Sequence, residues 1–88
     1  MKFETGRIVA TRGINDEMAR NDDFAEFVLK SLTRYLNGDW GDLCKHDKKL
    51  NDSAIKNNDD RILARYNDIY IITERDKSVT TVLFIDEY

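Results

Sequence analysis

The sequence contains no proline, one cysteine, one tryptophan and four glycines in its 88 residues. The lone cysteine excludes an intramolecular disulfide, and small secreted domains usually carry paired cysteines, so we expect a cytoplasmic protein. The longest dense apolar stretch, residues 79–85, is far shorter than the roughly 20 residues that span a bilayer. With no linker-like segment and no internal repeat, we expect a single domain over residues 1–88.

Positive charge is also in short supply, because 14 Lys and Arg residues stand against 17 Asp and Glu residues, for a net charge of −3. An acidic balance disfavours non-specific binding to nucleic acid or to anionic membranes, both of which need a positive surface. We therefore expect no direct nucleic-acid partner and no membrane partner. The charge permits binding to a basic protein surface, including one that itself binds nucleic acid.

The first half of the chain predicts one strand and two helices. Residues 6–11 alternate like a strand, whereas residues 15–20 give only a weak helical signal. Asp23 and Glu26 form a capping-box pattern that begins a helix, and Asn37-Gly38 ends it. A second helix is predicted over residues 42–56, with core-facing residues Leu43, Cys44, Leu50, Ala54 and Ile55.

The second half predicts three strands, at residues 61–66, 69–74 and 79–85. A two-residue turn at Asn67-Asp68 would place Tyr66 opposite Ile69 and would make Arg61 and Glu74 a cross-strand ion pair. The helices should cover the face formed by Ile62, Ala64, Tyr66, Ile69, Ile71, Val82 and Phe84. The outer face would then carry Arg61, Leu63, Arg65, Tyr70, Ile72, Glu74, Thr81 and Leu83. The predicted fold is α+β, with the order β-α-α-β-β-β and a mostly antiparallel sheet with two helices packed on one face.

Several short motifs resemble a family of short bacterial proteins that travel on plasmids, phages and integrated elements. In chain order these motifs are residues 6–11, Gly38-Asp39-Trp40-Gly41-Asp42, Asp47, Asn51-Asp52, Arg61-Ile62-Leu63, Ile71-Ile72-Thr73-Glu74, Ser78-Val79-Thr80-Thr81 and the closing Glu87-Tyr88. The resemblance covers nearly the whole chain. It implies a genomic context on mobile elements and does not by itself imply an activity.

The most distinctive candidate site is the group formed by Asp39, Trp40 and Asp42. One interpretation is a recognition loop, in which the tryptophan anchors a partner and the carboxylates contact its basic groups. The alternative is structural: an aspartate caps the second helix, Trp40 lies over the core, and the glycines permit the tight turn.

Two further groups are weaker candidates. Asp42, Cys44, His46 and Asp47 include zinc-ligand types, but Cys44 and His46 would diverge on a helix, so we expect no bound metal and no cofactor. Glu74 and Asp76 flank the second hairpin loop, where two carboxylates could divide acid and base roles or simply build a turn.

The function predicted from these features is protein binding by a mobile-element accessory protein that is not an enzyme. Its most concrete form is an inhibitor of a host defence nuclease, of the anti-CRISPR or antirestriction type. The partner would be a host protein with a basic surface, bound through Asp39, Trp40, Asp42, Glu74 and Asp76, with the outer sheet face as a second candidate. The alternative is a small hydrolase or nucleotide-binding enzyme that uses Asp39/Asp42 and Glu74/Asp76.

Overall fold

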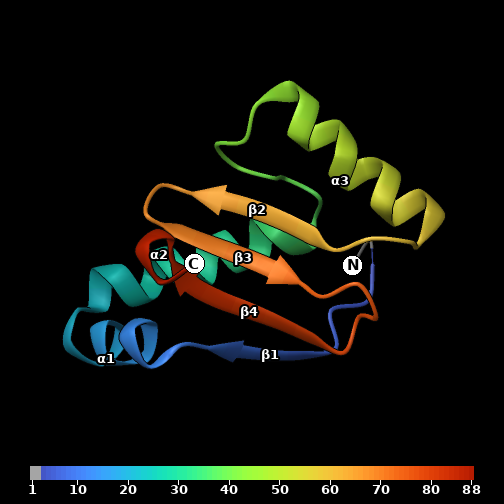
Figure 1. Cartoon of the computed structure of the whole chain (residues 1–88). Coiled ribbons are helices and arrows are strands. Elements are labelled where there is room, and N and C mark those ends of the chain that lie inside the picture. The colour runs from blue at the N-terminus through green and yellow to red at the C-terminus, as the bar shows by residue number, and fades with distance from the viewer. Residues whose placement is uncertain (1–2) are drawn as a thin grey trace.

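The computed structural model of the chain describes residues 3–88. In chain order its elements are the strand β1 (Arg7–Ala10), the helices α1 (Arg12–Arg20), α2 (Asp22–Leu36) and α3 (Lys45–Asn57), the strands β2 (Ile62–Tyr66), β3 (Ile69–Thr73) and β4 (Val79–Phe84), and the short 3₁₀ helix η1 (Ile85–Glu87). The strands form one mixed sheet in the order β1-β4-β3-β2 (Figure 1). β1 runs parallel to β4, and the other two pairings are antiparallel. The α+β class is confirmed.

The described chain has three α-helices, so the prediction of two was wrong. The additional helix, α1, is capped by Thr11, whose side-chain oxygen accepts a hydrogen bond from the amide of Ile14 at 3.3 Å. Ile14 is fully buried and anchors α1 to the core. The sequence signal is weak because Gly13 lies in the first turn, where glycine disfavours a helix by about 1 kcal/mol relative to alanine.

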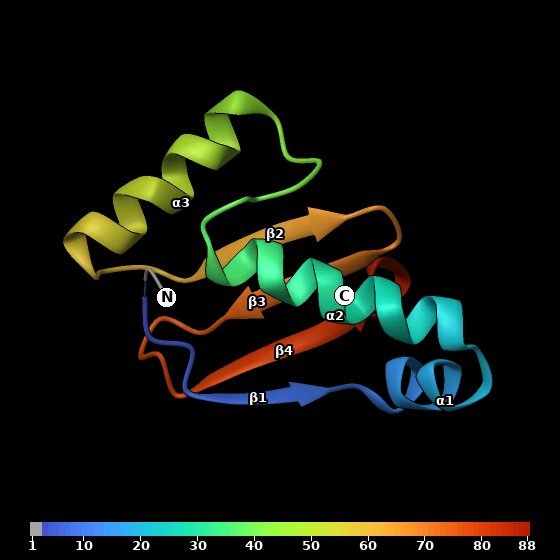
Figure 2. The same cartoon turned by 180° about the vertical axis from the view of Figure 1, so that it is seen from behind.

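α2 supplies the helical cover of the sheet, and Figure 2 shows it lying across one face. Its cap is Asn21 and not Asp23, because the Asn21 side chain accepts a hydrogen bond from the amide of Phe24 at 3.1 Å. The helix ends at Leu36 and is followed by Asn37 as its cap, as predicted. The buried residues of α2 are Val28, Ser31 and Tyr35.

α3 begins at Lys45 and not at Asp42, and Cys44 is its N-cap. Cys44 and Leu50 were predicted to face the core, but both are exposed, whereas Ala54 is buried. The two views show α3 beside the edge strand β2 and not across the sheet (Figures 1 and 2). α3 therefore does not cover the sheet face as predicted, because residues 38–44 carry the chain past the end of β2 first.

The β2–β3 hairpin has the predicted register, with Tyr66 opposite Ile69 and Asn67 at a φ of 55° in the turn. The face predicted to be covered lies in the core, formed by Ile62, Ala64, Tyr66, Ile69, Ile71, Val82 and, partly buried, Phe84. The expected ion pair of Arg61 with Glu74 is not among the salt bridges of residues 3–88. The Arg61 guanidinium lies instead over the ring of Tyr88, 5.8 Å from its centroid.

Three hydroxyl groups form a hydrogen-bonded chain in the core between α2 and the sheet. Thr80 donates to the carbonyl oxygen of Thr5 at 2.7 Å. The Thr80 hydroxyl uses its one proton on Thr5, so Thr73 donates to Thr80 at 2.7 Å. Tyr35 in turn donates to Thr73 at 2.6 Å, with the carbonyl oxygen of Ile62 at 3.3 Å as a second acceptor. Burial raises the pKa of Tyr35, which keeps its hydroxyl protonated as the first donor.

No helix within residues 3–88 combines the length and the apolar composition that crossing a membrane requires.

Candidate functional site

The loop that carries the predicted recognition residues, residues 38–42, is tied to the fold by its own polar groups. The Arg34 guanidinium donates two hydrogen bonds to the Asp39 carboxylate, at 2.8 and 3.1 Å. The same carboxylate accepts the amide of Gly41 at 3.1 Å. The Arg34 hydrogen bonds, followed by the Gly41 amide, hold the pKa of Asp39 below its usual value. Both charged side chains are about half exposed, so the pair stabilises the loop by only about 0.5–1 kcal/mol.

Trp40 belongs to the core, with 3% of its surface exposed. Its ring centroid lies 5.8 Å from that of Phe3 and 5.6 Å from that of Tyr35. The indole nitrogen donates to the Asp52 carboxylate at 3.0 Å, so its one polar group has a partner. A partner protein would therefore reach the Trp40 ring only after the loop had rearranged.

Gly41 and Asp42 extend the sheet beyond β2. The amide of Asp42 donates to the carbonyl oxygen of Arg65 at 2.7 Å, and its carboxylate accepts the amide of Asn67, also at 2.7 Å. Gly41 forms a parallel bridge with Arg65 at a φ of 71°, and a Cβ at this position would collide with the Arg65 carbonyl oxygen. These contacts explain the glycine and the aspartate structurally, as a cover over one end of the β2 edge.

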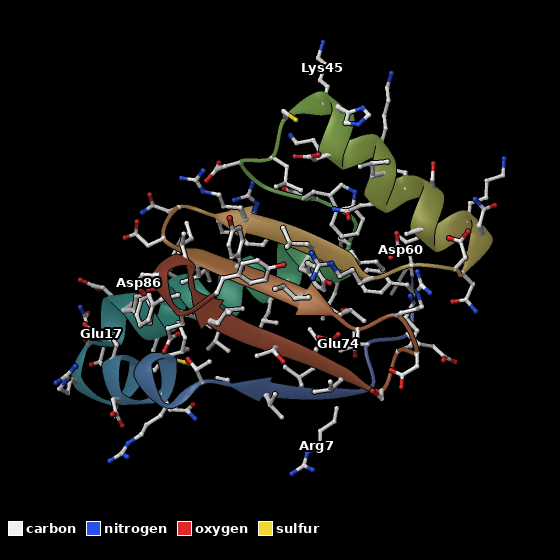
Figure 3. The ribbon with its side chains drawn as sticks, in the orientation of Figure 1. Arg7, Glu17, Lys45, Asp60, Glu74 and Asp86 are labelled. Atoms are coloured by element: carbon white, nitrogen blue, oxygen red, sulfur yellow. The ribbon has the colours of Figure 1, made fainter. Side chains whose placement is uncertain are left out.

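Glu74 and Asp76 lie in the β3–β4 loop, at the opposite end of the hairpin (Figure 3 labels Glu74). Hydrogen bonds from Ser78 hold the pKa of Asp76 below its usual value and close the turn. This end of the hairpin is four residues along the strand from the end that Asp42 covers, a separation of roughly 13 Å. The structure therefore brings Asp39 and Asp42 together in one loop but does not join them with Glu74 and Asp76 in one site.

The zinc-ligand types near Cys44 do not gather either. Cys44 is exposed at the start of α3, and His46 is exposed in its first turn. Within residues 3–88 no cluster of three or more His, Cys, Asp or Glu side chains is placed to hold a metal ion.

The side chain of Asn51 joins α3 to the edge of β2. Asn51 is buried. Its side-chain nitrogen donates to the backbone carbonyl oxygen of Leu63 at 2.7 Å, and its side-chain oxygen accepts a hydrogen bond from the backbone N–H of Leu63 at 3.2 Å. One side chain thus occupies both backbone groups that a neighbouring strand would have paired.

Between α3 and the start of β2 lies a groove with a volume of about 390 Å³, here called the α3–β2 groove. Its apolar lining comes from four side chains, Leu43, Leu50, Ala54 and Leu63. Leu50 is 55% exposed and borders the groove, so part of its apolar surface is open to a ligand. The volume lies within the range of ligand-binding clefts, about 300–1,000 Å³.

The polar part of the groove is predominantly acidic. Three carboxylates, those of Asp47, Asp59 and Asp60, share it with one cation, Arg61. Asp60 lies where the chain leaves α3 and approaches β2 (Figure 3), 3.9 Å from the Arg75 guanidinium. Asp47 and Asp59 form no salt bridge among the described residues. The groove thus offers apolar contacts beside carboxylates that are available to a cation.

Sequence reasoning did not identify the α3–β2 groove, although a signal was present. Asp47, Leu50, Asn51 and Ala54 follow the i, i+3, i+4, i+7 spacing of one helix face. That face mixes charged, apolar and amide side chains, which distinguishes it from a core stripe.

No protein-family model matches the chain, and neither a curated protein nor a solved structure is significantly similar to it.

Proposed function

We propose that this chain is a protein-binding module whose α3–β2 groove receives a segment with apolar side chains flanked by lysine or arginine. The observation that carries the proposal is the exposed Leu50 beside Asp47 and Asp59 in a groove of about 390 Å³. An apolar anchor in a pocket with a polar rim is the usual arrangement of a protein interface. Covering the exposed half of Leu50 is worth on the order of 1 kcal/mol, and the carboxylates add selectivity and faster association.

The most concrete form of the proposal is an inhibitor of a host defence nuclease, of the anti-CRISPR or antirestriction type. The resemblance to small proteins of plasmids and phages supports this form. Nucleases carry basic surfaces that contact phosphates, and such surfaces complement the three carboxylates of the groove. The enzyme alternative gains no support, because its carboxylate pairs lie at opposite ends of the sheet.

Leu50 and Leu29 make a matched pair for testing the groove. Leu50 is 55% exposed on α3, and Leu29 is 58% exposed on α2, outside the groove. We expect Leu50→Asn to weaken partner binding by about tenfold and Leu29→Asn to leave it unchanged. Melting curves of both variants establish that each remains folded.

The partner is sought with a photo-crosslinking amino acid placed at position 50 or at position 29. The native host proteins captured at position 50 and not at position 29 are then purified, and inhibition of DNA cleavage is measured for any nuclease among them. Equal crosslinking at both positions would contradict a binding site in the groove. Specific capture of a partner that is not a nuclease would support the groove as the binding site and would contradict the proposal that the protein inhibits a nuclease.

A further inference from the structure

The two edges of the sheet differ in how their backbone groups are used. The β2 edge is occupied: Asp42 donates to Arg65, and Asn51 pairs with both backbone groups of Leu63. The other edge is β1, and both views show it as the outermost strand, with α1 only at its end (Figures 1 and 2).

The backbone of β1 presents alternate peptide groups to β4 and to the outside. The amides of Arg7 and Thr11 donate to carbonyl oxygens of β4 or of the residue before it, at 3.1 and 3.0 Å. Because a parallel strand bonds one neighbour through every second residue, the peptide groups of Ile8 and Ala10 point away from β4. The only side chain among the described residues that bonds to this outer side is Asn15, whose amide reaches the Ala10 oxygen at 3.4 Å.

The side chains of β1 do little to block this edge. Native sheets usually protect an edge with proline, bulges, inward charges or short strands. β1 is short, at four residues, but it has none of the other devices between Ile8 and Ala10. Ile8 is 46% exposed, so an added strand would cover apolar surface as well as backbone.

We propose that β1 accepts an extended peptide segment as a fifth strand, and that this segment has an apolar centre with acidic residues at its ends. Arg7 lies at one end of the edge, where Figure 3 shows it pointing away from the sheet. Arg12 lies at the other end, with 92% of its side chain exposed and its carboxylate neighbour Asp16 at 3.8 Å. Two cations at the ends of an apolar edge favour an occupant with the opposite charges.

The same charges disfavour a second copy of the chain on this edge. If two β1 strands paired antiparallel with Ile8 opposite Ala10 of the other copy, Arg7 would face Thr11 and would lie beside Arg12. Two such like-charge contacts would form, one at each end of the short pairing. The segment therefore comes from a partner, by the addition of a strand to a sheet edge. This inference does not depend on the α3–β2 groove, which lies at the opposite edge of the sheet.

The test uses amide hydrogen exchange by NMR on the intact protein. The probe is a short peptide of alternating valine and threonine with glutamates at both ends. At millimolar peptide we expect exchange at Ile8 and Ala10 to slow by about tenfold or more, while Arg7 and Thr11, already bonded to β4, change little.

Three comparisons decide the outcome. A peptide with the same sequence but alternate N-methylated amides should give no protection, because it cannot complete the ladder. A peptide with lysine ends should bind more weakly, and Arg7→Glu with Arg12→Glu should reverse that order. The proposal would be overturned by unchanged exchange at Ile8 and Ala10, or by equal protection from the methylated peptide. It would also be overturned if, without peptide, protection rose with protein concentration, which would indicate that a second copy of the chain occupies the edge.

Discussion

Replacing Asn51 by leucine should detach α3 from the sheet with little change in side-chain volume. The substitution removes the side-chain oxygen and nitrogen of Asn51, which now bind the backbone N–H of Leu63 at 3.2 Å and its carbonyl oxygen at 2.7 Å. An unsatisfied buried polar group costs about 1–3 kcal/mol, so two partly covered groups should reduce the free energy of unfolding by about 2–4 kcal/mol. For a domain of this size the melting temperature should fall by roughly 10–25 °C.

Urea unfolding followed by circular dichroism measures this loss, with Ser53→Ala as the control, because Ser53 is an exposed residue on the same helix. Asn51→Asp refines the test, since its carboxylate can accept the Leu63 amide but cannot donate to the Leu63 carbonyl oxygen unless protonated. Because the folded state favours the protonated form, the aspartate variant should recover stability relative to wild type as the pH falls toward about 4, the ordinary pKa of an aspartate. A loss below about 0.5 kcal/mol for Asn51→Leu would refute the role assigned to this side chain.

Two further predictions concern the loop before α3. Arg34 lowers the pKa of Asp39 below its ordinary value of 3.8. The Arg34–Asp39 pair therefore stabilises the fold above pH 3.8, and this stabilisation is lost as the pH falls through the lowered pKa of Asp39 in the folded protein. In Asp39→Asn, the free energy of unfolding should thus fall less steeply between neutral and acid pH, by less than about 1 kcal/mol in total. The same pH dependence as in wild type would contradict the pairing. Gly41→Ala should reduce the free energy of unfolding by about 2 kcal/mol or more, because alanine disfavours a φ of 71° and its methyl group would meet the Arg65 carbonyl oxygen. An unchanged melting temperature would show that the loop can move aside.

The parts of the fold that the sequence predicted depend on neighbours in the chain. Asn67-Asp68 fixed the hairpin turn, and with that register the period-two geometry of the strands fixed which side chains face the core. The stop of α2 at Asn37 followed from the same kind of local chemistry.

The parts that were wrong depend on contacts that no short window contains. Asn21 and Asp23 are residue types that both cap helices well, and only the structure shows that Asn21 accepts the Phe24 amide. α1 persists because Ile14 reaches the core, which its own composition does not show. α3 stands beside β2 because Asn51 bonds the Leu63 backbone, a pairing that is set in three dimensions.

The candidate site was predicted less well than the fold. Trp40 attracted a binding role because it is the only tryptophan, yet its burial is what a large aromatic side chain most often does in a small core. Leu50 was assigned to the core on the strength of its spacing with Ala54. Hydrophobic spacing identifies a helix face, but it does not say whether that face meets the core or borders a groove.

The parallel pairing of Arg7 with Val79 has a consequence for how the chain folds. β2, β3 and β4 are joined by short turns, so their contacts form at little entropic cost. β1 joins the sheet only when residues 7–10 meet residues 79–82, which closes the largest loop in the topology. We expect the two hairpins to form early and β1 to dock last. Of the four strands of this sheet, the first to be synthesised would then be the last to find its partner. Until it does, the edge of β4 that it covers is open to any other strand that reaches it.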